Sequence, residues 1–158
     1  MTEFSHLNKE SQPFIVDVSE KKVTRRRAVA RCTVSLPYEV LTILQKEDFK
    51  TKKGSVFQTA IIAGIMAAKK TGELIPLCHP LGLESCEIHI RVNEDHEVVI
   101  DCVASIESKT GVEMEALTGV SIAALTIYDM CKSLSHEIKI RDIMLIEKTG
   151  GKHDFKRD

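Results

Sequence analysis

Two neighbouring segments of the chain alternate apolar and polar residues, and a short polar turn separates them. Within residues 83–92 and 98–106, the apolar members occupy every second position: Cys86, Ile88, Ile90 and Val92, then Val98, Ile100, Cys102, Ala104 and Ile106. A period of two places such side chains on one face of a strand. The turn Asn93-Glu94-Asp95-His96 favours chain reversal. The pattern predicts an antiparallel hairpin with one buried face.

The remaining periodic segments complete an α+β pattern. Residues 27–36 and 137–147 are expected strands, residues 37–45 a short helix, and residues 55–70 and 113–134 longer helices. Without the short helix, the order is the β-α-β-β-α-β pattern of a ferredoxin-like fold, an antiparallel sheet with helices on one face. We expect one domain over residues 1–158, with a flexible lead-in at 1–12 and a flexible basic tail at 148–158.

Composition narrows the class of protein. The formal net charge of -1 does not suggest a general nucleic-acid binder. The longest nearly apolar stretch, from Ala116 to Cys131, contains four polar residues and is too short to predict a bilayer span. The five cysteines include no Cys-x-x-Cys pair, which favours a reducing compartment without disulfides. We therefore expect a cytoplasmic protein without nucleic-acid or membrane partners.

The long predicted helix carries a line of chemically active residues. Steps of three and four connect Glu115, Thr118, Ile122, Leu125, Asp129 and Lys132. Asp129 and Lys132 are three apart and can touch. They form either a surface ion pair of small energetic value or a partly buried acid–base pair with perturbed pKa values. The pattern alone does not separate these interpretations.

Two further candidates lie in loops. His79, in Leu77-Cys78-His79-Pro80, is either a general acid or base or a histidine hydrogen-bonded within its loop. The pair Lys52-Lys53 precedes a helix start and is either part of an anion site or a solvated lysine pair, and the pattern alone favours the solvated pair.

Two other clusters permit a functional and a structural interpretation. The run Arg25-Arg26-Arg27 is most often a solvated surface, and the alternative is that its guanidinium groups bind the phosphates of a small ligand. Cys78, His79, Cys86 and His89 are close in sequence, as zinc ligands often are. Cys86 and His89 fall on opposite faces of one predicted strand, so no metal site is expected.

Several long runs, in order, make the chain resemble the cyclic pyranopterin monophosphate synthase family. They span residues 6–155 and include Val16-Asp17-Val18-Ser19, Lys53-Gly54, residues 62–69, residues 74–81, residues 109–118, residues 123–132 and Gly150-Gly151-Lys152. The resemblance implies a ferredoxin-like lyase of molybdenum cofactor biosynthesis, specifically a phosphorus–oxygen lyase. It implies conversion of 3′,8-cyclo-7,8-dihydro-GTP, the product of a radical partner enzyme, into cyclic pyranopterin monophosphate, with release of pyrophosphate and without metal or cofactor. It also implies a homohexamer, a trimer of dimers with sites at subunit interfaces.

The resemblance also assigns residues. Lys53, Asp129 and Lys132 would be catalytic, with lysines of lowered pKa transferring protons. The expected substrate-binding residues are Asp17, Arg26, Cys78, His79, Glu113, Met114, Glu115, Lys148 and Lys152. The chain departs from the family at Ile61, where arginine is frequent, at Gly119, where alanine is usual, and at His153 in the tail.

Two alternatives from other classes stay open. One is a non-catalytic nucleotide- or pterin-binding subunit, which needs the phosphate-binding residues but no acid–base group. The joint presence of Lys53, His79, Asp129 and Lys132 favours catalysis over that alternative. The other is a zinc-binding interaction module, which stoichiometric zinc in the purified protein would support.

Overall fold

A computed structural model describes residues 7–8 and 10–158. Most of the predicted lead-in, residues 1–6 and 9, lies outside the described residues. Within the described part of that segment, Leu7 forms an isolated antiparallel bridge with Pro13. The Asn8 side chain accepts hydrogen bonds from the backbone N–H groups of Glu10 and Gln12.

One antiparallel sheet carries the fold. Its five strands are β1 (Thr24–Ser35), β4 (Ser85–Val92), β5 (Val98–Ser108), β6 (Lys139–Thr149) and β7 (Phe155–Lys156). They lie in the order β4-β5-β1-β6-β7, and every neighbouring pair is antiparallel. The predicted hairpin is confirmed, with Ile88 opposite Cys102. A separate two-stranded hairpin joins β2 (Lys50–Thr51) to β3 (Gly54–Ser55).

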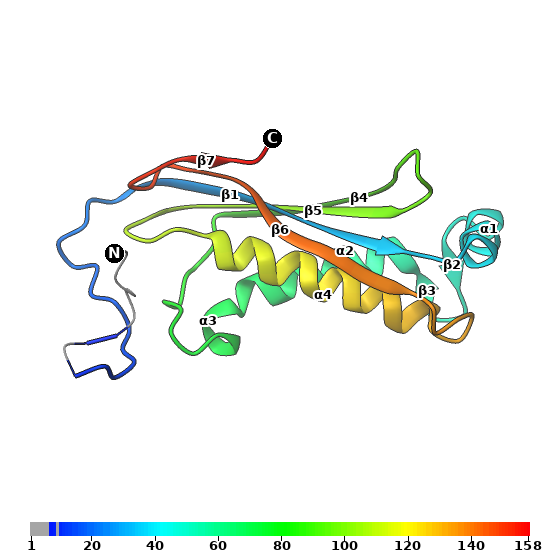
Figure 1. Cartoon of the computed structure of the whole chain (residues 1–158), viewed down its shortest axis with the longest axis horizontal. Coiled ribbons are helices and arrows are strands. Elements are labelled where there is room, and N and C mark those ends of the chain that lie inside the picture. The colour runs from blue at the N-terminus through cyan, green and yellow to red at the C-terminus, as the bar shows by residue number, and fades with distance from the viewer. Residues whose placement is uncertain (1–6, 9) are drawn as a thin grey trace.

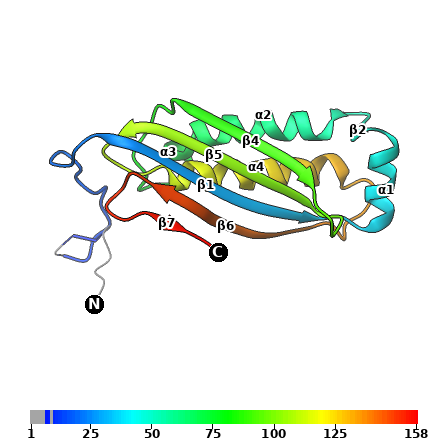
Figure 2. The ribbon, with the colours of Figure 1, turned by 90° about the horizontal axis from the view of Figure 1, so that it is seen from above.

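Helices cover one face of this sheet. The chain forms α1 (Tyr38–Lys46), α2 (Val56–Lys69), α3 (Thr71–Leu74) and α4 (Glu113–Cys131). α2 and α4 run side by side beneath the sheet, and α1 stands beyond its end (Figures 1 and 2). The predicted α+β, ferredoxin-like architecture is confirmed. Sequence analysis missed α3 and the β2–β3 hairpin, which are too short to show a periodic pattern.

The core lies between β1, β5 and the two long helices. The inward residues of β1, Ala28, Ala30, Cys32 and Val34, are fully buried. They meet the apolar stripe of α4, in which Val120, Ala124, Ile127 and Cys131 are also fully buried. Of the described helices, α4 alone is long and apolar enough to cross a membrane, but just over half of it is buried inside this fold.

Two glycines allow α2, α4 and β5 to approach closely. A Cβ at position 64 would lie 2.8 Å from the Gly119 carbonyl oxygen, and a Cβ at position 119 would lie 2.7 Å from Cys102 Sγ. Both distances are shorter than side chains tolerate. Gly119 therefore leaves the space that the Cys102 thiol occupies.

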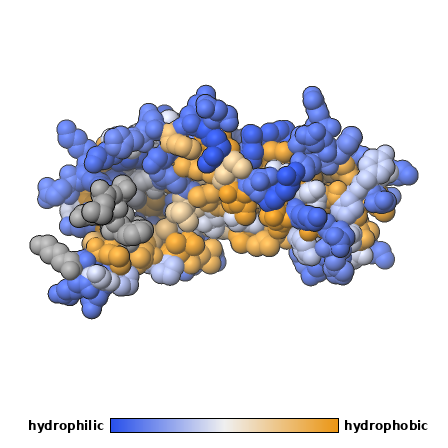
Figure 3. Space-filling view, in the orientation of Figure 1, coloured by the Kyte–Doolittle hydropathy of each residue, from blue (hydrophilic) through white to orange (hydrophobic). Residues whose placement is uncertain are grey.

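The opposite face of the sheet is open and charged. The Asp101 carboxylate on β5 forms two ion pairs, one between Oδ1 and Arg31 Nε at 2.6 Å and one between Oδ2 and Arg91 Nη1 at 2.6 Å. Val29 and Val103, which alternate with the inward residues of β1 and β5, are partly buried, and Val99 is buried. The outer surface of the helical layer is partly apolar (Figure 3), with Ile62, Met66 and Leu125 more than half exposed.

The C-terminal tail differs from the predicted flexible loop. Gly150 adopts a φ of +82°, and its N–H donates to Asp154 Oδ1 at 3.0 Å. This turn lets β7 pair with β6 through the register Lys148 opposite Phe155. A left-handed glycine followed by a capping aspartate supplies a local reason for the reversal.

Candidate functional site

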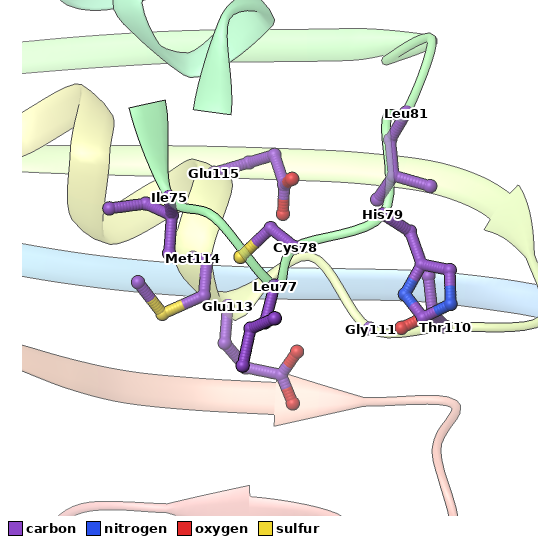
Figure 4. A pocket seen from close by; sticks show the side chains of 10 residues that line it. All are labelled: Ile75, Leu77, Cys78, His79, Leu81, Thr110, Gly111, Glu113, Met114 and Glu115. Carbon is purple, nitrogen blue, oxygen red and sulfur yellow. The ribbon is translucent and has the colours of Figure 1, made fainter. Parts of the chain in front are cut away.

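One pocket collects five of the predicted substrate-binding residues. The cavity, of about 320 Å³, lies between the 75–81 loop, the 110–111 loop and the start of α4 (Figure 4). The predicted residues that line it are Cys78, His79, Glu113, Met114 and Glu115. We call this cavity the α4 N-terminal pocket. It brings together residues separated by more than thirty positions in the sequence.

The pocket holds two carboxyl groups in different environments. Glu115 is only 3% exposed, and burial raises the pKa of its carboxyl, with the charge of Glu113 adding to the effect. Glu113 instead faces Lys148, whose Nζ lies 3.0 Å from Glu113 Oε1. Burial, and then the charge of Glu115, raises the pKa of the Cys78 thiol. Two acids in such contrasting surroundings suit proton transfer.

A basic hollow adjoins this pocket. Gly111 and Glu113 line both cavities, while Arg26 and Lys148 line only the hollow. The Arg26 guanidinium donates to the carbonyls of Ser108 at 3.3 Å and Lys109 at 3.4 Å, so its position is set by the backbone. Arginine and lysine side by side at a pocket rim suit an anionic group of a ligand.

The two other predicted substrate-binding residues lie outside both cavities. Lys152 is exposed in the turn before β7. Asp17 is exposed and accepts hydrogen bonds from the N–H of Ser19, at 2.8 Å, and from its hydroxyl. Neither residue lines the cavity that holds the other members of the set.

A second cluster forms where α4 ends. Lys53 Nζ lies 2.9 Å from Asp129 Oδ2, and Lys132 Nζ lies 2.8 Å from Asp129 Oδ1. Lys53 comes from the turn between β2 and β3, where Gly54 has a φ of +112°. The three residues that the resemblance assigns as catalytic therefore lie together, although Lys53 is 76 positions from Asp129 in the sequence.

The charges of this cluster are exposed rather than buried. Asp129 and Lys132 keep 54% and 52% of their side-chain surface. Hydrogen bonds from Lys132 and then Lys53 lower the pKa of Asp129 to about 2. The hydrogen bond to Asp129 raises the pKa of Lys132. Within this chain the pair is therefore an exposed ion pair rather than a partly buried one, and the pKa of Lys132 is raised, not lowered as the family chemistry would require.

The two clusters are far apart within one chain. Glu113 and Asp129 lie on the same helix, at positions that differ by 16 (129 − 113), or about 24 Å at 1.5 Å per residue. The predicted stripe from Glu115 to Lys132 exists, but it connects two sites rather than lining one.

A second, larger cavity lies beside Lys53. It measures about 760 Å³ and opens between α1, the β2–β3 hairpin and the end of α4. Lys50 and Lys52 line it together with Lys53. Sequence analysis considered Lys52, in the pair Lys52-Lys53, as part of an anion site, whereas Lys50 gave no signal beyond that of a solvated charged loop.

The cysteines and histidines do not form a metal centre in the described part of the chain. No group of three His, Cys, Asp or Glu side chains converges there as metal ligands do. Cys86 points toward Cys102, with 3.8 Å between the two sulfurs, whereas His89 lies on the exposed face beside Glu87.

The fold and the two clusters define an α+β protein with a pocket of acids and bases next to cationic side chains. Comparison with known proteins identifies its family, because residues 15–151 match the profile of the MoaC family. The chain belongs to the MoaC family.

The similar proteins differ in length. A cyclic pyranopterin monophosphate synthase of Xanthomonas campestris pv. campestris (strain B100) is 47% identical over 151 residues, covering 96% of this chain and 92% of that protein. The synthase of Lysinibacillus sphaericus (strain C3-41) is 46% identical, with 96% of each chain covered. A molybdenum cofactor biosynthesis bifunctional protein of Synechocystis sp. is 53% identical over 98% of this chain, which spans 46% of that protein's length.

Proposed function

We propose that this chain is a cyclic pyranopterin monophosphate synthase that acts on 3′,8-cyclo-7,8-dihydro-GTP. The observation that carries the proposal is the gathering of the family's assigned residues into two clusters at the ends of α4. Relatives that bear this name align along almost their whole length. The reaction releases pyrophosphate, closes the pyrano ring and forms a cyclic phosphate, which makes the enzyme a phosphorus–oxygen lyase.

The chemistry of the two clusters supports a division of roles. Lys53 and Lys132 place two ammonium groups on either side of one carboxylate, where they offset negative charge on the triphosphate. A carboxyl with a pKa of about 2 is a weak base at neutral pH, so Asp129 orients the lysines rather than accepting a proton.

The α4 N-terminal pocket supplies the other half of the reaction. His79 and Glu115 are groups that exchange protons, and Glu115 holds a proton more tightly than an ordinary glutamate. Arg26 and Lys148 line the small hollow at the rim of this pocket, where their cationic groups suit contact with a phosphate of the substrate.

Both clusters serve one substrate molecule only if two copies of the chain share the site. A helix length of about 24 Å separates them within a protomer. The exposed apolar side chains Ile62, Met66 and Leu125 on the helical layer are suited to burial between copies. We therefore include in the proposal an interface site, in a homohexamer built as a trimer of dimers.

A single-turnover assay tests the proposal. Purified protein is incubated with 3′,8-cyclo-7,8-dihydro-GTP, and pyrophosphate and cyclic pyranopterin monophosphate are quantified beside the Lys53→Ala and Lys132→Ala variants. The expected result is stoichiometric formation of both products by the wild type and loss of at least about 100-fold in the variants. Binding of the substrate without turnover by the wild type would instead favour a non-catalytic binding subunit.

A further inference from the structure

A short segment before β1 ties the two walls of the α4 N-terminal pocket together. We call residues 16–19 the strap. At one end, His79 Nε2 lies 2.8 Å from the Val16 carbonyl oxygen. At the other end, Lys109 Nζ donates to the Ser19 carbonyl oxygen at 2.7 Å. The strap thus connects the loop that bears His79 to the loop that leads into Gly111.

The side chain of Asp17 shapes this strap. Its Oδ1 accepts from the N–H of Ser19 at 2.8 Å and from the Ser19 hydroxyl. Such a turn fixes the two peptides that join Asp17, Val18 and Ser19, and these directly follow the peptide that bears the Val16 carbonyl. The turn therefore holds the strap against the loop that bears His79. The hydrogen bonds from Ser19 lower the pKa of Asp17, with a smaller effect from Lys109. One of the two carboxylate oxygens is therefore already engaged by the strap itself.

The Val16 carbonyl decides which nitrogen of His79 bears the proton. A carbonyl oxygen only accepts, so Nε2 must donate to it. In the neutral ring, Nδ1 is then the nitrogen with a free lone pair. Because His79 lines the pocket, this tautomer determines which ring atom can accept a proton or hydrogen bond from a ligand.

We propose that Asp17 and Lys109 are positioning residues: by holding the strap, they keep His79 in its Nε2–H tautomer and leave Nδ1 as the accepting atom. The expected effect on kcat rests on the proposed function. In this inference Asp17 positions the strap, in place of the expected role in binding substrate. Charge supports the replacement, since a carboxylate placed against a triphosphate repels it. Lys109 has no role in the predicted set of site residues.

A comparison of Asp17→Asn with Asp17→Ala separates positioning from substrate contact. Asparagine retains a side-chain oxygen that accepts from Ser19, whereas alanine removes it. We expect Asp17→Asn to keep kcat within about twofold, and Asp17→Ala and Lys109→Met to lower kcat on the order of 10-fold with little change in KM. The matched control is Glu20→Ala, which removes an exposed neighbouring carboxylate and should leave both constants unchanged.

The direct readout is the tautomer of His79 in the full-length protein. Two-bond ¹H–¹⁵N spectra of histidine-labelled protein distinguish the tautomers, and His79→Gln assigns the signal. The Nε2–H form is expected in the wild type and Asp17→Asn, and a mixture of forms in Asp17→Ala. An unchanged tautomer in a folded Asp17→Ala protein, or equal kinetic losses in both Asp17 variants, would overturn the inference. Absence of turnover in the wild type would contradict the proposed function alone, because the spectra do not depend on it.

Discussion

Glu113 and Asp129 stand at opposite ends of α4, so the two clusters to which they belong cannot meet within one protomer. If two copies share each site, then mixed oligomers of two inactive variants should regain activity. His79→Ala and Lys132→Ala should each be inactive alone. When the two are co-assembled, one site of each mixed pair is intact. We expect recovery to about a quarter of wild-type kcat for random pairing across a two-fold interface.

The matched control for this complementation uses two variants of the same cluster. Lys53→Ala mixed with Lys132→Ala should recover nothing, because each mixed pair then carries one defect in each site. No recovery between His79→Ala and Lys132→Ala despite confirmed mixed assembly would place the whole site within one chain. Recovery in the control would instead mean that Lys53 and Lys132 of one chain serve different sites.

Asp129 should titrate far below an ordinary aspartate. Its pKa of about 2 comes first from the hydrogen bond of Lys132 and then from that of Lys53. A carboxyl whose folded pKa is lowered stabilises the fold above its unfolded pKa, and that stability is lost as pH falls from about 4 to about 2. Carboxyl ¹³C titration should show a midpoint near 2 that rises more in Lys132→Ala than in Lys53→Ala. The reverse order would assign the dominant interaction to Lys53.

Glu115 should affect stability in the opposite sense. Burial raises the pKa of its carboxyl, so the favourable contribution is complete below the unfolded pKa and is lost as pH rises through the folded pKa. Glu115→Gln removes the ionisation while keeping the shape. Urea unfolding should therefore show a higher midpoint for Glu115→Gln than for the wild type at pH 7, and similar midpoints at pH 4. Equal midpoints at both pH values would mean that Glu115 is solvated.

Gly119 and Cys102 should be energetically coupled. Gly119→Ala gains about 1 kcal/mol of helix propensity, but its Cβ would lie 2.7 Å from Cys102 Sγ. Overpacking of this kind costs about 1 to 3 kcal/mol. We expect Gly119→Ala to lower the free energy of unfolding in the wild type and to raise it in a Cys102→Ala background. A double-mutant cycle by urea denaturation measures the coupling, and additive effects would contradict it.

Local periodicity was sufficient to predict the main elements. The β4–β5 hairpin and α4 have patterns of period two and near 3.6 that their burial reproduces, as at Ile100 and Val120. Element ends were less certain: α4 ends at Cys131 rather than at residue 134, since no capping residue marks its end.

Long-range contacts account for what the sequence did not reveal. The return of the tail depends on pairing between Lys148 and Phe155, and the capture of His79 depends on a backbone carbonyl 63 positions away. Every residue has a backbone carbonyl, so no sequence motif could predict which one forms the hydrogen bond with His79. Two local signals were available: Asp17 two residues before Ser19, and Gly150 four residues before Asp154, both typical of capped turns.

The unbroken helix that joins the two clusters also fixes the distance and the relative direction of their side chains. Each successive residue of α4 lies about 1.5 Å further along the helix axis and is turned by about 100° about that axis. A single inserted residue near Gly119 would therefore turn Asp129 by more than a quarter of a circle relative to Glu113, and no rotamer change restores that phase. The turn between β4 and β5 has no such constraint. Length variation among similar chains should accordingly be tolerated at residues 93–97 and excluded from the interior of α4.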